Sequence, residues 1–494
     1  MSTVLDWPFA SVLIANRGEI AVRILRTVRL LGLTGIVVYH AVDRNSLAVQ
    51  QADLAIEIQG PTPVAAYLDG AQIIAAARQA GAGAIHPGYG FLSENSGFAQ
   101  AVADAGIVFV GPTPQQIDLM GDKVRARSFV AAAGFPVAPS AIEDDDPATF
   151  IERAARIGFP LLIKPAAGGG GKGMRLVREL AVLPAEIERA RSEGKRYFGD
   201  GRLYVERYVE SPRHIEVQVL GDAHGNLVHL FERECSVQRR FQKIIEESPS
   251  PALDTETRTR ICEVGAGIAR SAGYQNAGTV EFIYGAGEFY FLEMNTRLQV
   301  EHPVTETITG IDLVLEQLRI AAGEPLGFAQ TDIATRGHAI EFRIYAEDPS
   351  RGYAPTTGPV LALHLPEGVR VDSGIVQGAE VSAAFDPMLA KLIVKGTDRA
   401  EAMARADAAL ADFVLLGCDT NLGFLRRLLH HPMFVKGEIH TGFLDAHPEI
   451  AQLAPLSVAL TARLLAAAAL VTRPVRDAAD SVPALHAAMG SWRN

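Results

Sequence analysis

Five polar side chains alternate along the stretch E-M-N-T-R-L-Q-V-E, which runs from Glu293 to Glu301. They are Glu293, Asn295, Arg297, Gln299 and Glu301. In an extended chain, alternate residues point to one face, so two carboxylates, two amides and a guanidinium can share a surface. We expect regular strand geometry only for the first half of this stretch, as far as Thr296.

A glycine-containing turn lies just before this stretch. Residues 279–284 read T-V-E-F-I-Y and are followed by Gly285-Ala286-Gly287, a pattern that predicts a β-hairpin. The hairpin would bring Glu281 beside Glu293, and two carboxylates with an amide oxygen from Asn295 are hard ligands of the kind that Mg²⁺ takes. The solvated face of an edge strand is the alternative interpretation, and the alternation by itself supports either.

A second candidate segment is the glycine run 168–171, which continues as Lys172-Gly173. Glycine loses the most backbone entropy on folding, and successive unobstructed N–H groups can bind phosphate. The run is not a P-loop, because no Ser or Thr follows the lysine and a strand-like stretch follows instead of a helix. Predicted strands at 159–164 and 174–177 flank it, with Lys164 at the end of the first. We therefore favour a mobile flap that closes over phosphates, with a flexible linker as the alternative.

Two further motifs carry weaker signals. Arg239, Arg240 and Lys243 form the densest basic cluster, which is usually a solvated face but can also hold anions. The turn 86–90, H-P-G-Y-G, follows a predicted strand at 84–86, and open α/β sheets bind ligands at the carboxyl ends of their strands. A plain Pro-Gly turn is the alternative interpretation of that segment.

Composition limits the class of protein. The chain has 494 residues, 48% of them hydrophobic and 21% charged, which is typical of a globular protein of two to four domains. Its net charge of −11 disfavours a nucleic-acid surface. Cys235, Cys262 and Cys418 are few and far apart, and with no signal-peptide pattern they indicate a reducing, cytoplasmic location. The apolar run 464–471 is too short to span a membrane.

The order of predicted elements gives the fold class. Strands at 11–15, 36–39, 84–86 and 108–110 alternate with helices at 20–31, 71–80 and 96–105, which predicts a parallel α/β sheet in a Rossmann-like N-terminal domain. Later elements are strands at 203–209, 214–220, 228–232, 337–345, 360–365, 369–372 and 389–394, and helices at 148–157, 254–272, 312–322, 399–412 and 420–430. Composition shifts near residue 447, and an Ala/Leu-rich helix is expected over 453–471.

Together the motifs resemble the biotin carboxylase family, a branch of the ATP-grasp enzymes, from about Val12 to His447. They are I-A-N-R-G-E-I-A at 14–21, A-I-H-P-G-Y-G-F-L-S-E-N at 84–95, M-G-D-K at 120–123, G-G-G-G-K-G-M at 168–174, P-R-H-I-E-V-Q-V at 212–219, E-M-N-T-R-L-Q-V-E-H-P-V-T-E at 293–306 and R-G-H-A-I-E-F-R-I-Y-A-E-D-P at 336–349. The resemblance implies an N-terminal Rossmann-like domain at 1–121, an ATP-grasp domain at 122–335 with a mobile lid at about 138–208, and an α+β C-terminal domain at 336–446. Residues 447–494 resemble the start of a connector toward a biotinyl region.

The resemblance also implies a nucleotide site with ATP and Mg²⁺, for which Mn²⁺ is a possible substitute. The implied ATP contacts are Lys123, Lys164, Gly169, Gly170, Gly171, Lys172, Gly173, Met174, Glu206, Arg207, Tyr208, Val209, His214 and Gln238. The implied metal ligands are Glu281, Glu293 and Asn295.

The implied reaction is attack of bicarbonate on the γ-phosphate to give carboxyphosphate, followed by carboxylation of N1′ of biotin. Glu301 matches the general base, and a carboxylate beside cations stays ionised at neutral pH, as a base must. Arg297 would stabilise the biotin enolate and Arg343 would hold the carboxyphosphate and biotin oxygens. The implied bicarbonate pocket is Lys243, Arg297, Gln299 and Val300, and Tyr89 resembles a residue on the biotin side.

The sequence departs from the family pattern at Phe241, where a histidine that contacts phosphate in some members is common. No A-M-K-M biotinylation motif is present, so biotin is expected on a carrier domain or protein. The resemblance further implies a carboxyltransferase partner, a homodimer or a larger assembly, and an acyl-CoA as the final acceptor. Alternatives are an ATP-grasp ligase acting on another carboxylate, and a nucleotide-binding scaffold protein.

Overall fold

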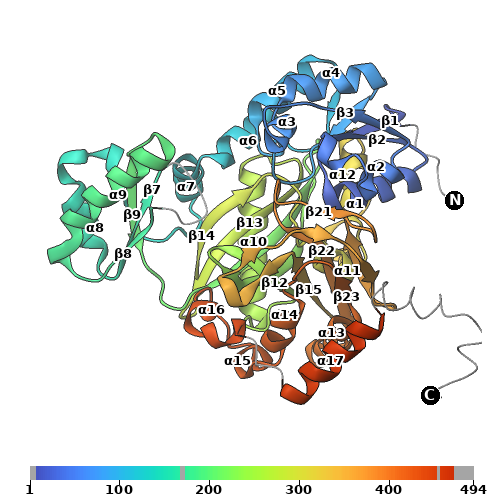
Figure 1. Ribbon diagram of the computed structural model, residues 1–494. Coiled ribbons are helices and arrows are strands. Elements are labelled where there is room, and N and C mark those ends of the chain that lie inside the picture. Colours follow the sequence, from blue (N-terminus) through green and yellow to red (C-terminus); the bar gives the residue numbers. More distant parts are fainter. Residues whose placement is uncertain (1–6, 167–172, 453–456, 472–494) are drawn as a thin grey trace, which may run out of the picture. The chain divides into compact units, whose positions relative to one another are not determined.

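The computed structural model describes residues 7–166, 173–452 and 457–471 (Figure 1). The chain divides into two units, residues 1–450 and 451–494. The predicted phosphate-binding glycines Gly169, Gly170 and Gly171, together with Lys172, lie outside the described residues.

A parallel five-stranded sheet forms the first part of the chain, as predicted. Its order is β3-β2-β1-β4-β5, with strands β1 (Ser11–Ile14), β2 (Thr34–Tyr39), β3 (Leu54–Glu57), β4 (Ala84–His86) and β5 (Val108–Phe109). Alternate residues of β1 enter two different cores, Val12 and Ile14 one of them and Leu13 the other. Apolar burial on both faces is what a doubly wound α/β sheet requires. The helices here are α1 (Gly18–Leu30), α2 (Leu47–Gln51), α3 (Pro63–Tyr67), α4 (Gly70–Ala80), α5 (Ser96–Asp104) and α6 (Pro114–Gly121).

An antiparallel four-stranded sheet with its own core follows α7 (Lys123–Ala132). Its order is β6-β9-β7-β8, with β6 (Ser140–Ile142), β7 (Leu161–Pro165), β8 (Arg175–Val177) and β9 (Leu203–Arg207). Helices α8 (Phe150–Ile157) and α9 (Leu183–Phe198) lie beside this sheet (Figure 1), and their apolar residues share its core. Helix α9 was not predicted. β7 and β8 pair antiparallel, so strands do flank the glycine run, as expected.

The largest element is an antiparallel sheet of eight strands in the order β14-β13-β10-β11-β12-β15-β22-β20. Its strands are β10 (Arg213–Gly221), β11 (Leu227–Arg239), β12 (Gln242–Ser248), β13 (Asn276–Gly285), β14 (Glu288–Asn295), β15 (His338–Tyr345), β20 (Arg370–Ser373) and β22 (Met388–Gly396). β12 pairs with β15, so this one sheet joins strands from either side of residue 335. Side chains from distant parts of the sequence can therefore meet on it.

The strand prediction at 228–232 was too short, and β12 was missed. β11 continues to Arg239 through residues that look like a polar loop, yet Arg233, Glu234 and Gln238 are buried. Their burial is compensated by polar partners, most of them on neighbouring strands, as when Arg233 Nε donates to Glu216 at 2.5 Å. A polar pattern in sequence does not reveal such partners.

The strand prediction at 360–365 was also wrong in part. β18 (Gly358–Pro359) pairs with β21 (Glu380–Val381), whereas β19 (Ala362–His364) pairs with β23 (Val414–Leu416). β16 (Glu347–Asp348) pairs with β17 (Ala354–Pro355). The remaining helices of this unit are α10 (Thr255–Ser271), α11 (His302–Thr309), α12 (Leu313–Ala321), α13 (Arg399–Asp412), α14 (Leu422–Leu429), α15 (Pro432–Lys436) and α16 (Phe443–Ala446).

The second unit contains α17 (Val458–Val471), which begins later than the helix expected from residue 453. Residues 453–456 lie outside the described part of the chain. No helix among the described residues is long and apolar enough to cross a membrane.

Candidate active site

A cavity of about 1040 Å³ brings the predicted site residues together. Of those that the structure describes, all except Gly173 line it: Tyr89, Lys123, Lys164, Met174, Glu206, Arg207, Tyr208, Val209, His214, Gln238, Lys243, Glu281, Glu293, Asn295, Arg297, Gln299, Val300, Glu301 and Arg343. They come from the four-stranded and the eight-stranded sheets, from the first residue of α7, from the segment just before β8, and from the segments that follow β4, β9 and β14. A cavity of this volume can hold a nucleotide and a second substrate.

The predicted hairpin is present, with Glu281 of β13 directly opposite Glu293 of β14. Cross-strand partners project from the same face of a sheet, so both carboxylates face the cavity. The strand ends at Asn295, and Glu301 instead precedes the first turn of α11. Strand alternation therefore directs only Glu293 and Asn295 toward the cavity. Arg297, Gln299 and Glu301 reach the cavity from the non-strand segment between β14 and α11.

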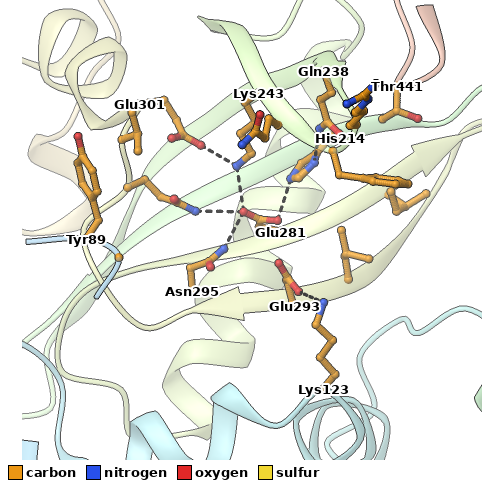
Figure 2. A pocket seen from close by; sticks show the side chains of 18 of the residues that line it. Tyr89, Lys123, His214, Gln238, Lys243, Glu281, Glu293, Asn295, Glu301 and Thr441 are labelled. Atoms are coloured by element: carbon orange, nitrogen blue, oxygen red, sulfur yellow. Dashed lines mark hydrogen bonds and ion pairs between the residues drawn. The ribbon is translucent and has the colours of Figure 1, made fainter. Parts of the chain in front are cut away.

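Lys243 lies at the centre of the site (Figure 2). Its Nζ is 2.5 Å from Glu216, 2.6 Å from Glu301 and 3.0 Å from Glu281. Burial works against the charge on Lys243, but the three carboxylates outweigh it and raise its pKa well above the usual value. One permanently charged ammonium thus holds three carboxylates that would otherwise repel one another.

Glu301 is fully buried and is held between two cations. Its Oε1 accepts from Lys243, and its Oε2 is 3.0 Å from Arg343. Burial alone would raise the pKa of Glu301, but Lys243 and Arg343 overcome it and hold that pKa well below its usual range. The carboxylate is therefore ionised at neutral pH, which is the state a general base needs.

Arg343 is in turn held by Glu246, whose Oε1 lies 2.5 Å away. Burial raises the pKa of Glu246 to about 7, although Arg343 acts to lower it. Arg297 is positioned by Glu94, 3.0 Å away, and donates to Gln299 Oε1 at 2.7 Å. Both guanidiniums are thus fixed before any substrate arrives, as electrostatic stabilisation of a developing charge requires.

The carboxylate pair on the hairpin fits a divalent cation. Glu281 Oε1 accepts from Asn295 Nδ2 at 2.7 Å and from Gln299 Nε2 at 3.0 Å, while Oε2 is 2.9 Å from His214. Glu293 Oε2 lies 2.7 Å from Lys123 (Figure 2). Two carboxylates and one amide oxygen, on paired strands and already matched to cations, are the hard donor set that Mg²⁺ prefers.

The other end of the cavity combines cations with apolar walls. Lys164 forms an ion pair with Glu206, and Arg127 is 3.3 Å from the same carboxylate. Leu162, Tyr204 and Phe291 line this cavity as well. Apolar walls with a few fixed charges suit a nucleotide, whose base is flat and whose phosphates are anionic.

The basic cluster is divided by the structure. Lys243 faces the site, and Arg239 is largely buried against Glu347 at 2.9 Å, so a solvated face is wrong for both. Arg240 is exposed. Phe241, at the turn between β11 and β12, is 57% exposed, with a backbone φ of 65°. It lines the cavity mouth without a polar group to offer a phosphate.

Several site residues were missed from the sequence. Glu216 holds Lys243, Glu246 holds Arg343 and Glu94 holds Arg297, but each of these carboxylates appeared as an ordinary strand or loop residue. Only Glu216 carried a signal, the polar–apolar alternation of a strand that is in fact buried on both faces. Thr441 and Asp445 also line the cavity, and nothing in the local sequence marked them.

Three family models match the chain. They are "Biotin carboxylase, N-terminal domain" over residues 8–117, "Carbamoyl-phosphate synthase L chain, ATP binding domain" over 122–329 and "Biotin carboxylase C-terminal domain" over 341–446.

Curated relatives match over most of the chain. A pyruvate carboxylase subunit from Methanothermobacter thermautotrophicus is 48% identical over 89% of this chain and 90% of its own. Biotin carboxylase of Nostoc sp. is 47% identical over 88% of this chain and 99% of its own. The mitochondrial methylcrotonoyl-CoA carboxylase α-subunit from Rattus norvegicus is 49% identical over 88% of this chain, but the match spans only 62% of that longer protein.

Solved structures agree with these relatives. The biotin carboxylase domain dimer of 2-oxoglutarate carboxylase from Hydrogenobacter thermophilus, in complex with MgADP, ADP and bicarbonate, has a TM-score of 0.86 at 42% identity, covering 90% of this chain and 99% of that one. Biotin carboxylase from Campylobacter jejuni, in a β-γ-ATP complex, has a TM-score of 0.85 at 43% identity, covering 89% and 99%.

Proposed function

The chain belongs to the biotin carboxylase family, and from this premise we propose how its own residues carry out ATP-dependent carboxylation of biotin with bicarbonate. The observation that supports the assignment most is the ionised Glu301, buried between Lys243 and Arg343 in the cavity that also holds the hairpin carboxylates. A base, two fixed cations and a metal-binding pair within one cavity are the parts that this reaction needs.

We assign nucleotide binding to the end of the cavity that holds Lys123 and Lys164. These ammoniums pair with Glu293 and Glu206 respectively. ATP phosphates would compete for the same cations. Glu281, Glu293 and Asn295 would hold Mg²⁺, which when bound neutralises phosphate charge and bridges phosphate oxygens.

We assign bicarbonate and biotin chemistry to the other end. Glu301 would take the proton of bicarbonate, and Lys243, Gln299 and Arg297 would orient the resulting anion toward the γ-phosphate. Arg343 would hold the carboxyphosphate oxygens. Arg297 would then stabilise the negative charge that develops on the biotin ureido oxygen.

Glu301→Gln tests the central role. Amide for carboxylate keeps the shape but removes the base, so we expect biotin- and bicarbonate-dependent phosphate release to fall about 10²- to 10⁴-fold. Nucleotide affinity, measured by calorimetry, should stay near that of the wild type because the nucleotide site lies at the other end. Unchanged turnover in Glu301→Gln would refute this assignment of the base, and a wild-type protein without biotin-dependent phosphate release would refute the function.

We further propose a biotin carrier domain or protein and a carboxyltransferase as partners, with an acyl-CoA as the final acceptor. Methylcrotonoyl-CoA carboxylase α-subunits at 46–49% identity support an acyl-CoA. The pyruvate carboxylase subunit, at 48%, supports a 2-oxo acid as the second candidate. Reconstitution with the partners from the same source, supplied in turn with acetyl-, propionyl- and methylcrotonyl-CoA and with pyruvate, decides between them.

A further inference from the structure

Three distant segments of the chain meet at the ammonium of Lys391. Lys391 lies within β22, and its side chain has no exposed surface. Its Nζ donates to the backbone carbonyl of Val300 at 2.7 Å and lies 3.3 Å from Glu19 Oε1. A fully buried ammonium is costly unless it is paired, and these two contacts, with the nearby charges of Asp372 and Glu341, offset that cost.

Glu19 connects this ammonium to the wall of the cavity. It lies in the first turn of α1 and is 4% exposed. Its Oε1 accepts a hydrogen bond from the hydroxyl of Tyr89, whereas its buried Oε2 has no hydrogen-bond partner among the described residues. Tyr89 lies on the Glu301 side of the cavity, away from His214 (Figure 2). One carboxylate oxygen is thus shared between Lys391 and Tyr89.

The Val300 carbonyl belongs to the segment that carries the base. Val300 lies between Gln299 and Glu301, both of which line the cavity. The carbonyl of Gln299 is 2.7 Å from Nδ1 of the buried His302. The backbone carbonyls of Gln299 and Val300 are therefore both hydrogen-bonded by buried side chains. The orientation of these two peptide groups determines the position of the Glu301 backbone, and hence of its side-chain carboxylate.

We propose that Lys391 is a positioning residue for the carboxylation reaction. Lys391 holds the Val300 carbonyl and, through Glu19, the Tyr89 hydroxyl. It thereby fixes the position of Glu301 relative to Tyr89, which lies on the side of the cavity assigned to biotin. Lys391 does not line the cavity, so it touches no substrate. This inference rests on the proposed function, because it assigns Lys391 a part in the same reaction.

The test compares Lys391→Met with Lys395→Met. Lys395 lies on the same strand, is exposed, and donates to another backbone carbonyl, that of Thr307, at 2.8 Å. The control therefore removes a similar lysine-to-carbonyl bond away from the cavity. Misplacing a reacting group by about 1 Å can cost 10²-fold in rate, so we expect kcat for biotin-dependent phosphate release to fall about 10- to 100-fold in Lys391→Met. We expect Lys395→Met to stay within about twofold of the wild type.

If Lys391 had a purely structural role, its substitution would change the fraction of folded protein and not only kcat. If Lys391 only stabilised the fold, the amount of active enzyme would fall, and nucleotide-binding sites and kcat would be lost together. A positioning role predicts a full complement of nucleotide-binding sites, an ADP affinity within about threefold of the wild type, and a lower kcat with a raised KM for bicarbonate. Lys391→Arg, which keeps a cation, should recover part of the rate.

Glu19→Gln provides a second route if Lys391→Met does not fold. The amide can still accept from Tyr89 but cannot pair as an anion with Lys391, so we expect a smaller loss of kcat with unchanged ADP affinity. In the double variant the losses should not add, because both changes break one network. Equal kcat in Lys391→Met and Lys395→Met, or additive losses, would overturn the inference while the wild type stays active. A wild type that releases no phosphate would overturn the proposed function itself.

Discussion

Single residues in this site act through the charges of their neighbours. Lys243 contacts three carboxylates, yet the consequences differ, because Glu281 and Glu301 have lowered pKa values whereas that of Glu216 is raised. Glu281 and Glu301 each have a second partner, His214 and Arg343 respectively, and these cations help to lower their pKa values. Glu216 also has a second cation, Arg233, but its complete burial and the nearby charge of Glu301 outweigh both cations and raise its pKa.

The proposed metal pair gives a prediction at this scale. Glu293→Gln removes one anionic ligand, so the Mg²⁺ concentration that supports half-maximal phosphate release should rise roughly tenfold or more. Glu288→Gln is the matched control, because Glu288 starts the same strand but is exposed. Titrating Mg²⁺ at a fixed ATP concentration measures this half-maximal Mg²⁺ concentration for Glu293→Gln and for Glu288→Gln. Equal Mg²⁺ requirements in the two variants would exclude Glu293 as a ligand.

Glu246 predicts a pH effect on stability. Its pKa is about 7 in the fold against an ordinary value of 4.5, so between these pH values the folded state keeps a proton that the unfolded state has lost. Stability from this group is complete below about pH 4.5 and falls as pH rises toward 7, by about 1.4 kcal/mol per pH unit. Glu246→Gln should therefore gain stability relative to the wild type as pH rises.

Denaturant midpoints of the wild type and of Glu246→Gln, measured at pH 5 and at pH 7.5, test whether the variant gains stability relative to the wild type as pH rises. Most other titrating groups are common to both proteins, so the change of the midpoint difference with pH reports on Glu246 together with the neighbours whose charges it affects, such as Arg343 and Glu341. A difference that stays constant across this range would show that Glu246 is already ionised in the folded protein.

Among the elements, the β13–β14 hairpin shows local sequence and local structure in agreement. Its two-residue turn consists of Ala286 and Gly287, with φ of 52° and 80°. A turn with two positive φ values follows the right-handed twist of paired strands. Gly287 accepts that conformation freely, but Ala286 does not, because its Cβ crowds the backbone there. The hairpin is kept although one turn residue is unfavourable.

Ala286→Asn should relieve part of this strain. Asparagine tolerates positive φ, and the site is exposed, so we expect the hairpin to gain about 0.5–1 kcal/mol. Slower hydrogen exchange of β13 and β14 amides would report the gain. Ala286→Val is the matched opposite, because a β-branched residue is worse at positive φ and should speed exchange. Shifts of the same sign in both variants would contradict the explanation.

At the scale of the 1–450 unit, buried ion pairs connect elements that are far apart in sequence. Arg23 of α1, with a side chain only 1% exposed, lies 2.7 Å from both Glu306 and Asp312. Glu306, in α11, also contacts Arg370 of β20 at 2.7 Å. A network of this kind fixes the N-terminal helix against the later sheet, and the cavity lies among the elements thus joined.

Arg23→Met should be strongly destabilising. It leaves the buried Glu306 and the partly exposed Asp312 without one partner, and for the loss at the buried site we expect about 3–5 kcal/mol. Arg29→Met on the same helix is the control, because its pair with Asp53, at 3.5 Å, is half-exposed and worth at most about 1 kcal/mol. Denaturant midpoints compare the two variants. Similar midpoints would mean that the Arg23 network contributes little beyond a surface pair.

The sequence by itself determined the parallel N-terminal sheet, the family and the hairpin register of Glu281 with Glu293, because these follow from local periodicity, turn chemistry and long motifs. Only the tertiary structure decided which carboxylates are ionised and which cations hold them. Glu216 and Glu246 come from strands far from Glu301 in sequence, and they meet through the pairing of β10, β11, β12 and β15. Ionisation depends on burial and on charges within a few ångströms, which the order of residues along a chain does not specify.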